Sequence, residues 1–168
     1  MSRRIGVCFL AMIAVTVPRA TRAQIAAHWS VAAGASLPTS SFGDTYDTGY
    51  HVLAAIGLQP ALSPVGFRID GMFNEFNRSN LTNSKVRVLG LTANAVLATG
   101  GIGPYLIGGL GAYSNQYRPG TGSSSDVGFN IGGGFRFGLT GFSVFAEARY
   151  HRVADAAQFI PITFGITF

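Results

Sequence analysis

The chain has 168 residues, of which 12 are basic and 7 acidic, for a formal net charge of +5, and it contains one cysteine. A single cysteine excludes a disulfide framework within the chain and a multi-cysteine metal site. No apolar stretch approaches 18 residues, which excludes a membrane-spanning helix but leaves shorter, alternating transmembrane strands open.

Residues 1–23 have the layout of a cleaved secretory signal peptide. A positive start precedes an apolar run at 5–17 and a group of small residues, and we expect cleavage after Ala23. The run is too short to cross a hydrocarbon core of about 30 Å as a helix. The segment also holds four basic residues and the cysteine (Arg3, Arg4, Arg19, Arg22 and Cys8). Residues 24–168 are therefore nearly neutral, and the basicity does not favour nucleic-acid binding.

Residues 24–168 are predicted to form one domain of eight strands. Apolar side chains alternate with small or polar ones, and a period of two residues indicates strands with two different faces. The predicted strands are 28–37, 49–58, 65–74, 85–97, 104–113, 126–137, 142–151 and 160–168. The strand at 104–113 is too rich in glycine for its facing to be assigned.

One face of the predicted sheet is almost continuously apolar, and the other carries charges. In 65–74, Phe67 and Ile69 share one face while Arg68 and Asp70 share the other. A soluble monomer does not expose so large an apolar surface. If the apolar face contacts lipid and the charged face lines the inside, both faces lie in a suitable environment. Closing the sheet into a barrel also leaves no strand edge with unpaired backbone groups in the membrane. We therefore predict an all-β fold, an eight-stranded antiparallel up-and-down transmembrane barrel.

The connections are predicted to differ between the two ends of this barrel. Tight turns at 59–64, 99–103 and 138–141 share one end with both termini. Longer polar stretches are expected at the other end, after the first, third, fifth and seventh strands. Short periplasmic turns and longer external loops are typical of outer-membrane barrels.

The C-terminal residues resemble the ending of a known family. The sequence Phe-Ala-Glu-Ala-Arg-Tyr-His at 145–151, followed by the alternating strand at 160–168, is similar to outer-membrane β-barrel domain proteins, the OmpA/OmpX-like eight-stranded barrels. The resemblance covers 24–168 in pattern, but only the last twenty-odd residues are motif-like. It implies a Gram-negative-type cell outer membrane and no periplasmic domain after Phe168. It also implies an assembly signal for the barrel-assembly machinery (Ile162, Phe164, Ile166 and Phe168).

Inward charged residues form the first candidate site. They are Arg68, Asp70, Arg136, Glu147 and Arg149. Two arginine–acid pairs are spaced two residues apart on a strand, so each pair faces one side. Because an eight-stranded barrel is only wide enough for side chains to fill it, we predict an ion network that plugs a polar lumen. This predicts a structural or surface-interaction role. A small pore for ions or solutes remains the alternative.

Catalysis is the less favoured alternative. His151 could act as a base beside Glu147, as some small outer-membrane barrels modify lipopolysaccharide. A lipid A deacylase of this size pairs its histidine with a serine two residues later, and here that position is Val153. The histidines show no metal-ligand spacing. We therefore predict no enzymatic activity, cofactor or metal.

Three basic residues near the external end of the fourth strand form a second candidate site. Arg78, Lys85 and Arg87 could bind lipopolysaccharide phosphates through charge-assisted hydrogen bonds, or could be ordinary solvated rim charges. The expected partners are outer-membrane lipid and lipopolysaccharide, and the barrel-assembly machinery during insertion. We expect a monomer and no nucleic-acid partner.

Overall fold

The computed structural model of the protein describes residues 25–60, 63–81, 83–120, 122–154 and 156–168. The predicted signal peptide at 1–23 lies outside the described residues. Among those that are described, no helix is long and apolar enough to cross a membrane.

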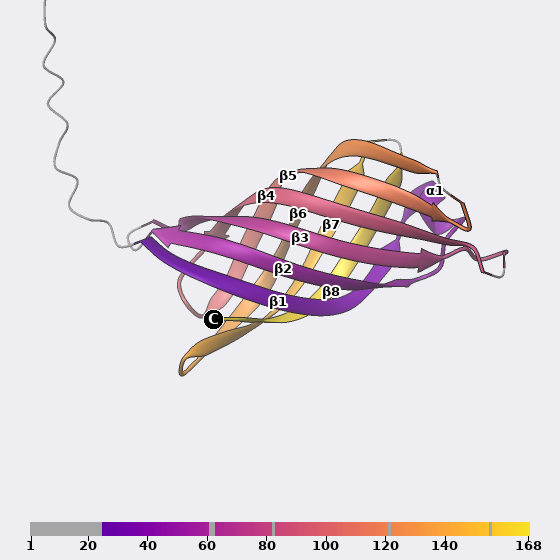
Figure 1. The fold of residues 1–168 in the computed structure, drawn as a ribbon. Helices are drawn as coiled ribbons and strands as arrows, with labels where there is room; N and C mark the ends of the chain where they lie inside the picture. Colours follow the sequence, from indigo (N-terminus) through magenta and orange to yellow (C-terminus); the bar gives the residue numbers. More distant parts are fainter. Residues whose placement is uncertain (1–24, 61–62, 82, 121, 155) are drawn as a thin grey trace, which may run out of the picture.

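Eight strands close into a single antiparallel barrel (Figure 1). Each strand pairs with its neighbour in the sequence, and the last pairs with the first. The strands are β1 (Ile25–Pro38), β2 (Gly49–Pro60), β3 (Val65–Asn77), β4 (Lys85–Ala98), β5 (Gly103–Arg118), β6 (Ser123–Leu139), β7 (Phe142–Val153) and β8 (Ala157–Thr167). One short helix, α1 (Ser40–Gly43), lies between β1 and β2. The predicted eight-stranded fold is confirmed.

The two ends of the barrel differ in their connections. The described N-terminal residues and the C-terminus lie at one end, the terminal end, whereas α1 lies at the opposite end, the loop end (Figure 1). The prediction of a longer connection after every odd-numbered strand is wrong after β5 and after β7. Residues 119–122 join β5 to β6 and residues 154–156 join β7 to β8, and neither connection is longer than 61–64 or 99–102 at the terminal end. The reason is that the strands continue further than expected at the loop end, where Gln116 pairs with Ser123 and Val153 pairs with Ala157.

Alternation along the strands separates the two faces of the wall. Large apolar side chains cover the outside, among them Ile56, Phe67, Leu91, Leu110, Ile131 and Phe164. The facing of β5 is now defined, because Tyr105, Ile107 and Tyr113 are buried inside while Leu106 and Leu110 are exposed outside. Glycine in β6 leaves room for this arrangement. A Cβ on Gly134 would lie 2.6 Å from the ring of Tyr105.

The wall closes where β8 meets β1. Ala33 pairs with Phe164 in the middle of the seam, and Trp29 and Phe168 exchange backbone hydrogen bonds at its terminal end. The rings of Trp29 and Phe168 also stack, with centroids 4.4 Å apart. The proposed assembly residues Ile162, Phe164 and Ile166, with Phe168, therefore lie on the exposed outer face of the closing strand.

Candidate functional site: the filled lumen and the basic loop end

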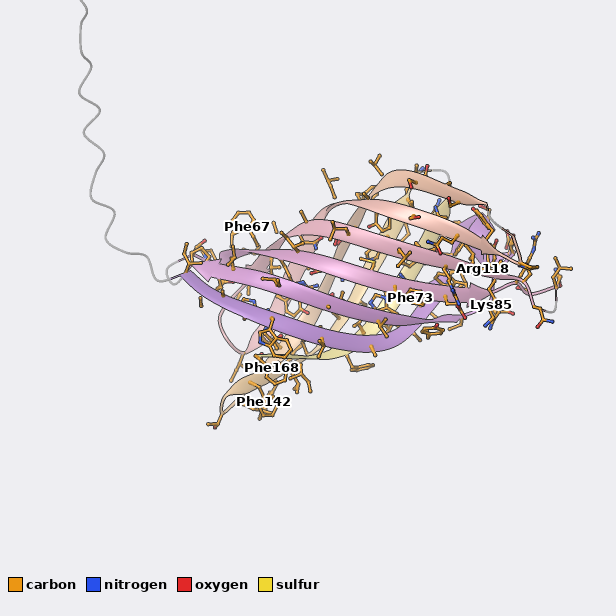
Figure 2. All side chains as sticks on the ribbon, in the orientation of Figure 1. Phe67, Phe73, Lys85, Arg118, Phe142 and Phe168 are labelled. Carbon is orange, nitrogen blue, oxygen red and sulfur yellow. The ribbon has the colours of Figure 1, made fainter. Side chains whose placement is uncertain are left out.

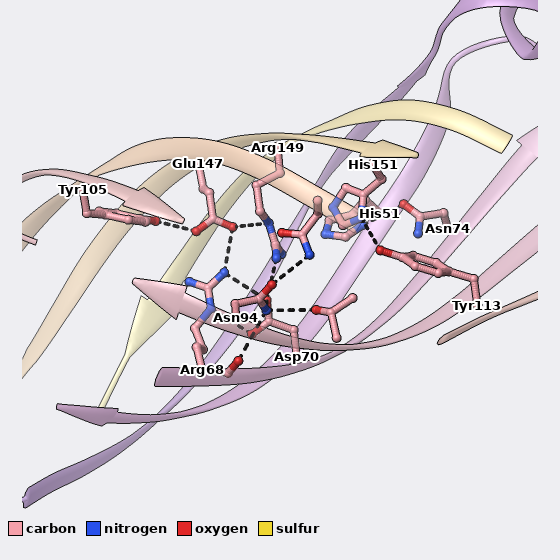
Figure 3. Close-up of polar contacts among 12 residues, drawn as sticks. His51, Arg68, Asp70, Asn74, Asn94, Tyr105, Tyr113, Glu147, Arg149 and His151 are labelled. Carbon is pink, nitrogen blue, oxygen red and sulfur yellow. Dashed lines mark hydrogen bonds and ion pairs between the residues drawn. The ribbon is translucent and has the colours of Figure 1, made fainter. Parts of the chain in front are cut away.

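The middle of the lumen holds four charged side chains that form a closed ring of ion pairs. Arg68 contacts Asp70 at 2.8 Å and Glu147 at 2.9 Å. Arg149 contacts the same two carboxylates, at 2.7 and 2.8 Å. We call Arg68, Asp70, Glu147 and Arg149 the ion ring (Figure 3). Two positive and two negative charges alternate around it, so each buried charge faces only opposite charges, which offsets its loss of hydration.

The ion ring spans the barrel because its members come from strands that are not neighbours. Arg68 and Asp70 lie on β3, whereas Glu147 and Arg149 lie on β7, so the contacts between them cross the lumen. All four side chains are at least 95% buried. The spacing of two residues within each strand places both members of a pair on the inner face.

Neutral polar side chains hold the carboxylates of the ion ring in place. The Tyr105 hydroxyl donates to Glu147 Oε2 at 2.7 Å. The Asn94 amide donates to Asp70 Oδ2 at 3.2 Å and is itself held by Thr92 and Asn130. These hydrogen bonds occupy carboxylate lone pairs that the arginines leave free, as buried charges require.

Arg136 does not join the ion ring, although the sequence predicted that it would. Its guanidinium lies over the ring of Tyr105, with Cζ 5.4 Å from the ring centroid. Tyr105 thus lies between Arg136 and the carboxylate of Glu147, to which its own hydroxyl donates. Among the described residues, Arg136 has no carboxylate within ion-pair distance and its Nε has no hydrogen-bond partner.

A histidine layer lies next to the ion ring on its loop-end side. His51 Nδ1 lies 2.8 Å from Asn74 Oδ1, which also accepts from Ser36. Because the Asn74 amide donates to the Val88 carbonyl, the assigned amide orientation makes His51 Nδ1 the donor. His151 Nδ1 lies 2.9 Å from the Tyr113 hydroxyl, and its ring stacks on Phe159. Among the described residues, the side-chain partners of His151 are therefore Tyr113 and Phe159, and they include neither a serine nor a carboxylate.

The loop end of the lumen is filled by apolar side chains, contrary to the polar lumen that the sequence predicted. Phe42 from α1 meets Phe76 edge to face at 5.2 Å, and Phe76 meets Phe159 at 5.6 Å. We call this the aromatic layer, which also contains Met72, Val86, Val88, Val153 and Ala157. Continuing the alternation of β3 past its predicted end at 74 would have placed Phe76 inside. Nothing in the loop sequence identified Phe42.

Tyr46 fixes the entry of α1 into the barrel mouth. Its ring packs on Phe42 at 4.6 Å, and the backbone at Tyr46 pairs with Arg78 in the next loop. Burial raises the pKa of the Tyr46 phenol, consistent with its packed position against Phe42.

Toward the terminal end, a basal layer of Val96, Tyr105, Ile107 and Phe145 fills the lumen. Beyond it a cavity of about 570 Å³ opens, lined partly by Gln59, Thr99 and Arg136. We call this cavity the terminal vestibule, and Arg136 is the basic residue in its lining.

The second candidate site lies on the outer face of the loop end. Glu75 accepts from Lys85 Nζ at 2.9 Å and from Arg87 Nε at 2.7 Å. Arg118 pairs with Lys85 across β4 and β5, and Figure 2 shows these two side chains close together. We call Lys85, Arg87 and Arg118 the basic cluster. Arg118 was missed from the sequence because β5 extends beyond its predicted end at 113.

Arg78 and Arg152 occupy other positions at this end. Arg78 lies in the loop after β3, where its amide donates to the Ser84 carbonyl, and it does not lie on the outer wall with Lys85 and Arg87. Arg152 faces outward near the end of β7 beside Phe129, and sequence reasoning missed it because the strand was predicted to end at 151. Within the described residues, no group of three or more His, Cys, Asp or Glu side chains could hold a metal ion.

Comparisons with known proteins agree with this architecture. Residues 7–168 match the family model described as outer membrane protein beta-barrel domain. Neisserial surface protein A superimposes with a TM-score of 0.64 at 17% identity, covering 84% of this chain and 94% of that one. Ail, the attachment invasion locus protein of Yersinia pestis, gives 0.57 at 15%, covering 84% and 97%. The N-terminal barrel domain of Pseudomonas aeruginosa OprF gives 0.55 at 18%, covering 86% and 100%. No curated protein matches significantly.

Proposed function

Because the chain belongs to the outer-membrane protein β-barrel domain family, we propose that it is a structural or surface-interaction protein of the outer membrane with a side-chain-plugged lumen. The family places the barrel in the outer membrane. The proposal adds that the signal peptide at 1–23 directs export, that 160–168 guides insertion by the assembly machinery, and that the barrel works as a monomer without enzymatic activity.

The proposal of a plugged lumen rests on the succession of layers of side chains that fill it. The ion ring crosses the lumen at its middle, and the aromatic layer and basal layer occupy it on either side. A permeating ion would have to separate buried ion pairs, and removing one partner from such a pair is strongly unfavourable. An eight-stranded barrel also has little width to spare around filling side chains.

The surface role draws support from the loop end and from the relatives. Neisserial surface protein A and the attachment invasion locus protein carry surface or attachment roles in their names, and none of the three reported names describes an enzyme. A rigid, filled barrel would hold α1 and the adjoining loops at a fixed position above the membrane. The loop end is polar at its tip, where Ser79 donates to Asp47.

A small pore is the second candidate, and the terminal vestibule favours it. The cavity beside Arg136 would attract anions to one mouth of the lumen. Conduction would then require the ion ring, the aromatic layer and the basal layer to rearrange together.

Planar-bilayer recording tests the plug directly. The purified protein should give no steady discrete conductance. A triply opened variant, Arg149→Ser with Phe145→Ser and Phe159→Ser, removes a large side chain from each of the three layers and should conduct if it retains the faster migration of the unboiled barrel on a denaturing gel. Steady single-channel steps from the unmodified protein would overturn the plug and favour the pore.

A further inference from the structure

We propose that the outer face of β2–β5 at the loop end is a binding site for lipid A, the phosphorylated, multi-acyl glycolipid of the outer leaflet. An acyl chain would lie in an apolar groove of the wall, and a phosphate would bind the basic cluster. The proposal rests on the function proposed above in one respect, because it requires the loop end to face outward from the cell.

The groove is a depression in the apolar face of the wall. It has a volume of about 690 Å³ and is lined almost entirely by apolar atoms. Gly71 forms part of its floor, while Phe73 and Leu91 stand at its sides. A floor without side chains between large neighbours creates a channel in which a flexible acyl chain can make close contacts on several sides.

The basic cluster lies at the loop-end head of this groove. Arg87 Cζ lies 5.9 Å from the centroid of Phe73, which itself lines the groove. Figure 2 shows Phe73 close to Lys85 and Arg118 at this end of the barrel. Glu75 balances only one of the three positive charges. Lys85 and Arg87 remain 44% and 37% exposed, so they keep donors available for a phosphate.

A second groove favours lipid A over a phospholipid that carries a single phosphate. It has a volume of about 640 Å³, lies between Leu110 and Phe129, and has Arg152 in its wall. The two grooves share Ala112 on β5. The basic residues on β4 and β7 are three strand spacings apart, about 14 Å along the sheet. Two adjoining acyl grooves with separate basic residues fit a lipid with several chains and two phosphates. A phospholipid with one phosphate would engage only one basic position.

The first experiment compares lipids. The full chain is expressed with its leader, and the purified barrel is placed in phosphatidylethanolamine nanodiscs containing equal amounts of lipid A and phosphatidylglycerol. The lipids that remain bound are counted by native mass spectrometry. Lipid A should be retained about tenfold more than phosphatidylglycerol, the advantage expected from one additional charge-assisted hydrogen bond. Equal retention of the two lipids, or preference for phosphatidylglycerol, would overturn the proposal.

The second experiment fills the groove. A Cβ at Gly71 has only the Ala54 carbonyl oxygen within 4 Å, at 3.9 Å, so Gly71→Leu should fold while occupying the groove. Lipid A retention should fall about tenfold, as when a buried apolar contact of this size is lost. Gly108→Leu is the matched control, because Gly108 lies on β5 away from both grooves and its Cβ would approach Asn130 O to 3.5 Å. Equal retention by the two variants would contradict the site.

Charge variants test whether lipid A binds the basic cluster specifically or is attracted by any positive charge at this end of the barrel. Arg87→Gln should lower lipid A retention about tenfold, whereas Arg78→Gln removes the same charge from the neighbouring loop and should change it little. Equal losses would indicate non-specific attraction and would overturn the assignment. Heat-modifiable migration checks the folding of every variant. If the unmodified protein shows no preference for lipid A and no conductance, the lipid A proposal fails and the proposal of a plugged lumen stands. If the unmodified protein conducts, only the proposal of a plugged lumen fails.

Discussion

Asp70 inside the lumen and Glu75 on the outer wall are each shared by two basic side chains. Asp70 lies 2.8 Å from Arg68 and 2.7 Å from Arg149, while Glu75 lies 2.9 Å from Lys85 and 2.7 Å from Arg87. The distances are nearly the same, but the basic partners of Asp70 are buried and those of Glu75 are partly exposed. Contact geometry alone therefore does not indicate how strongly an ion pair supports a fold.

The surroundings decide the difference because water competes for exposed charges. Lys85 and Arg87 can exchange Glu75 for water or a lipid phosphate at small cost, so their pairs resemble surface salt bridges. Arg68 and Arg149 have no such alternative, and a missing partner would leave a buried charge uncompensated. The inner pairs thus maintain the filled lumen, whereas the outer pairs leave basic groups able to bind a ligand.

Asp70→Asn should have the largest effect. The substitution leaves the ion ring with a net positive charge in the lumen and should lower the free energy of unfolding by about 4 kcal/mol. Denaturant titration in lipid vesicles, followed by the fluorescence of the single tryptophan, Trp29, measures this value. Adding Arg149→Met restores neutrality and should recover part of the loss. A double variant less stable than the sum of the two single changes predicts would contradict charge balance as the cause.

Tyr105→Phe should have an intermediate effect. It removes the hydroxyl that donates to Glu147 and keeps the ring beneath Arg136, so unfolding should become easier by about 2 kcal/mol, as for a lost hydrogen bond to a charged group. The same fluorescence titration applies. Tyr117→Phe, at an exposed position near the loop end of β5, is the matched control. An equal loss in both variants would mean that the hydrogen bond to Glu147 contributes nothing specific.

Glu75→Gln should have the smallest effect, about 0.5 kcal/mol, because its partners are partly solvated. The difference from the unmodified protein should shrink further in 1 M salt, where charges are screened beyond about 3 Å. Comparison of the titrations at low and high salt measures this. A loss as large as that of Asp70→Asn would show that the outer pairs are as essential to the fold as the ion ring.

Much of the barrel was predictable because each strand meets two different environments. The alternation at 142–151 correctly placed Glu147 and Arg149 inside and Ala146 and Ala148 outside. Strand ends were predicted too short at the loop end, where Ser114 to Arg118 and the serines that start β6 give no apolar period. Those polar residues continue the strands through backbone pairing, which side-chain patterns do not report.

The sequence by itself determined the eight strands, the alternating faces of all but β5, and the inward position of the ion-ring residues, because these depend on periodicity within single strands. The tertiary structure decided which inward charges meet. Closure brings β3 opposite β7 and pairs Arg68 with Glu147, while the ring of Tyr105 keeps Arg136 apart. It also placed Phe42 over Phe76 and aligned the basic cluster with the groove. These contacts join distant segments, and their partners are set by strand register and barrel closure rather than by local pattern.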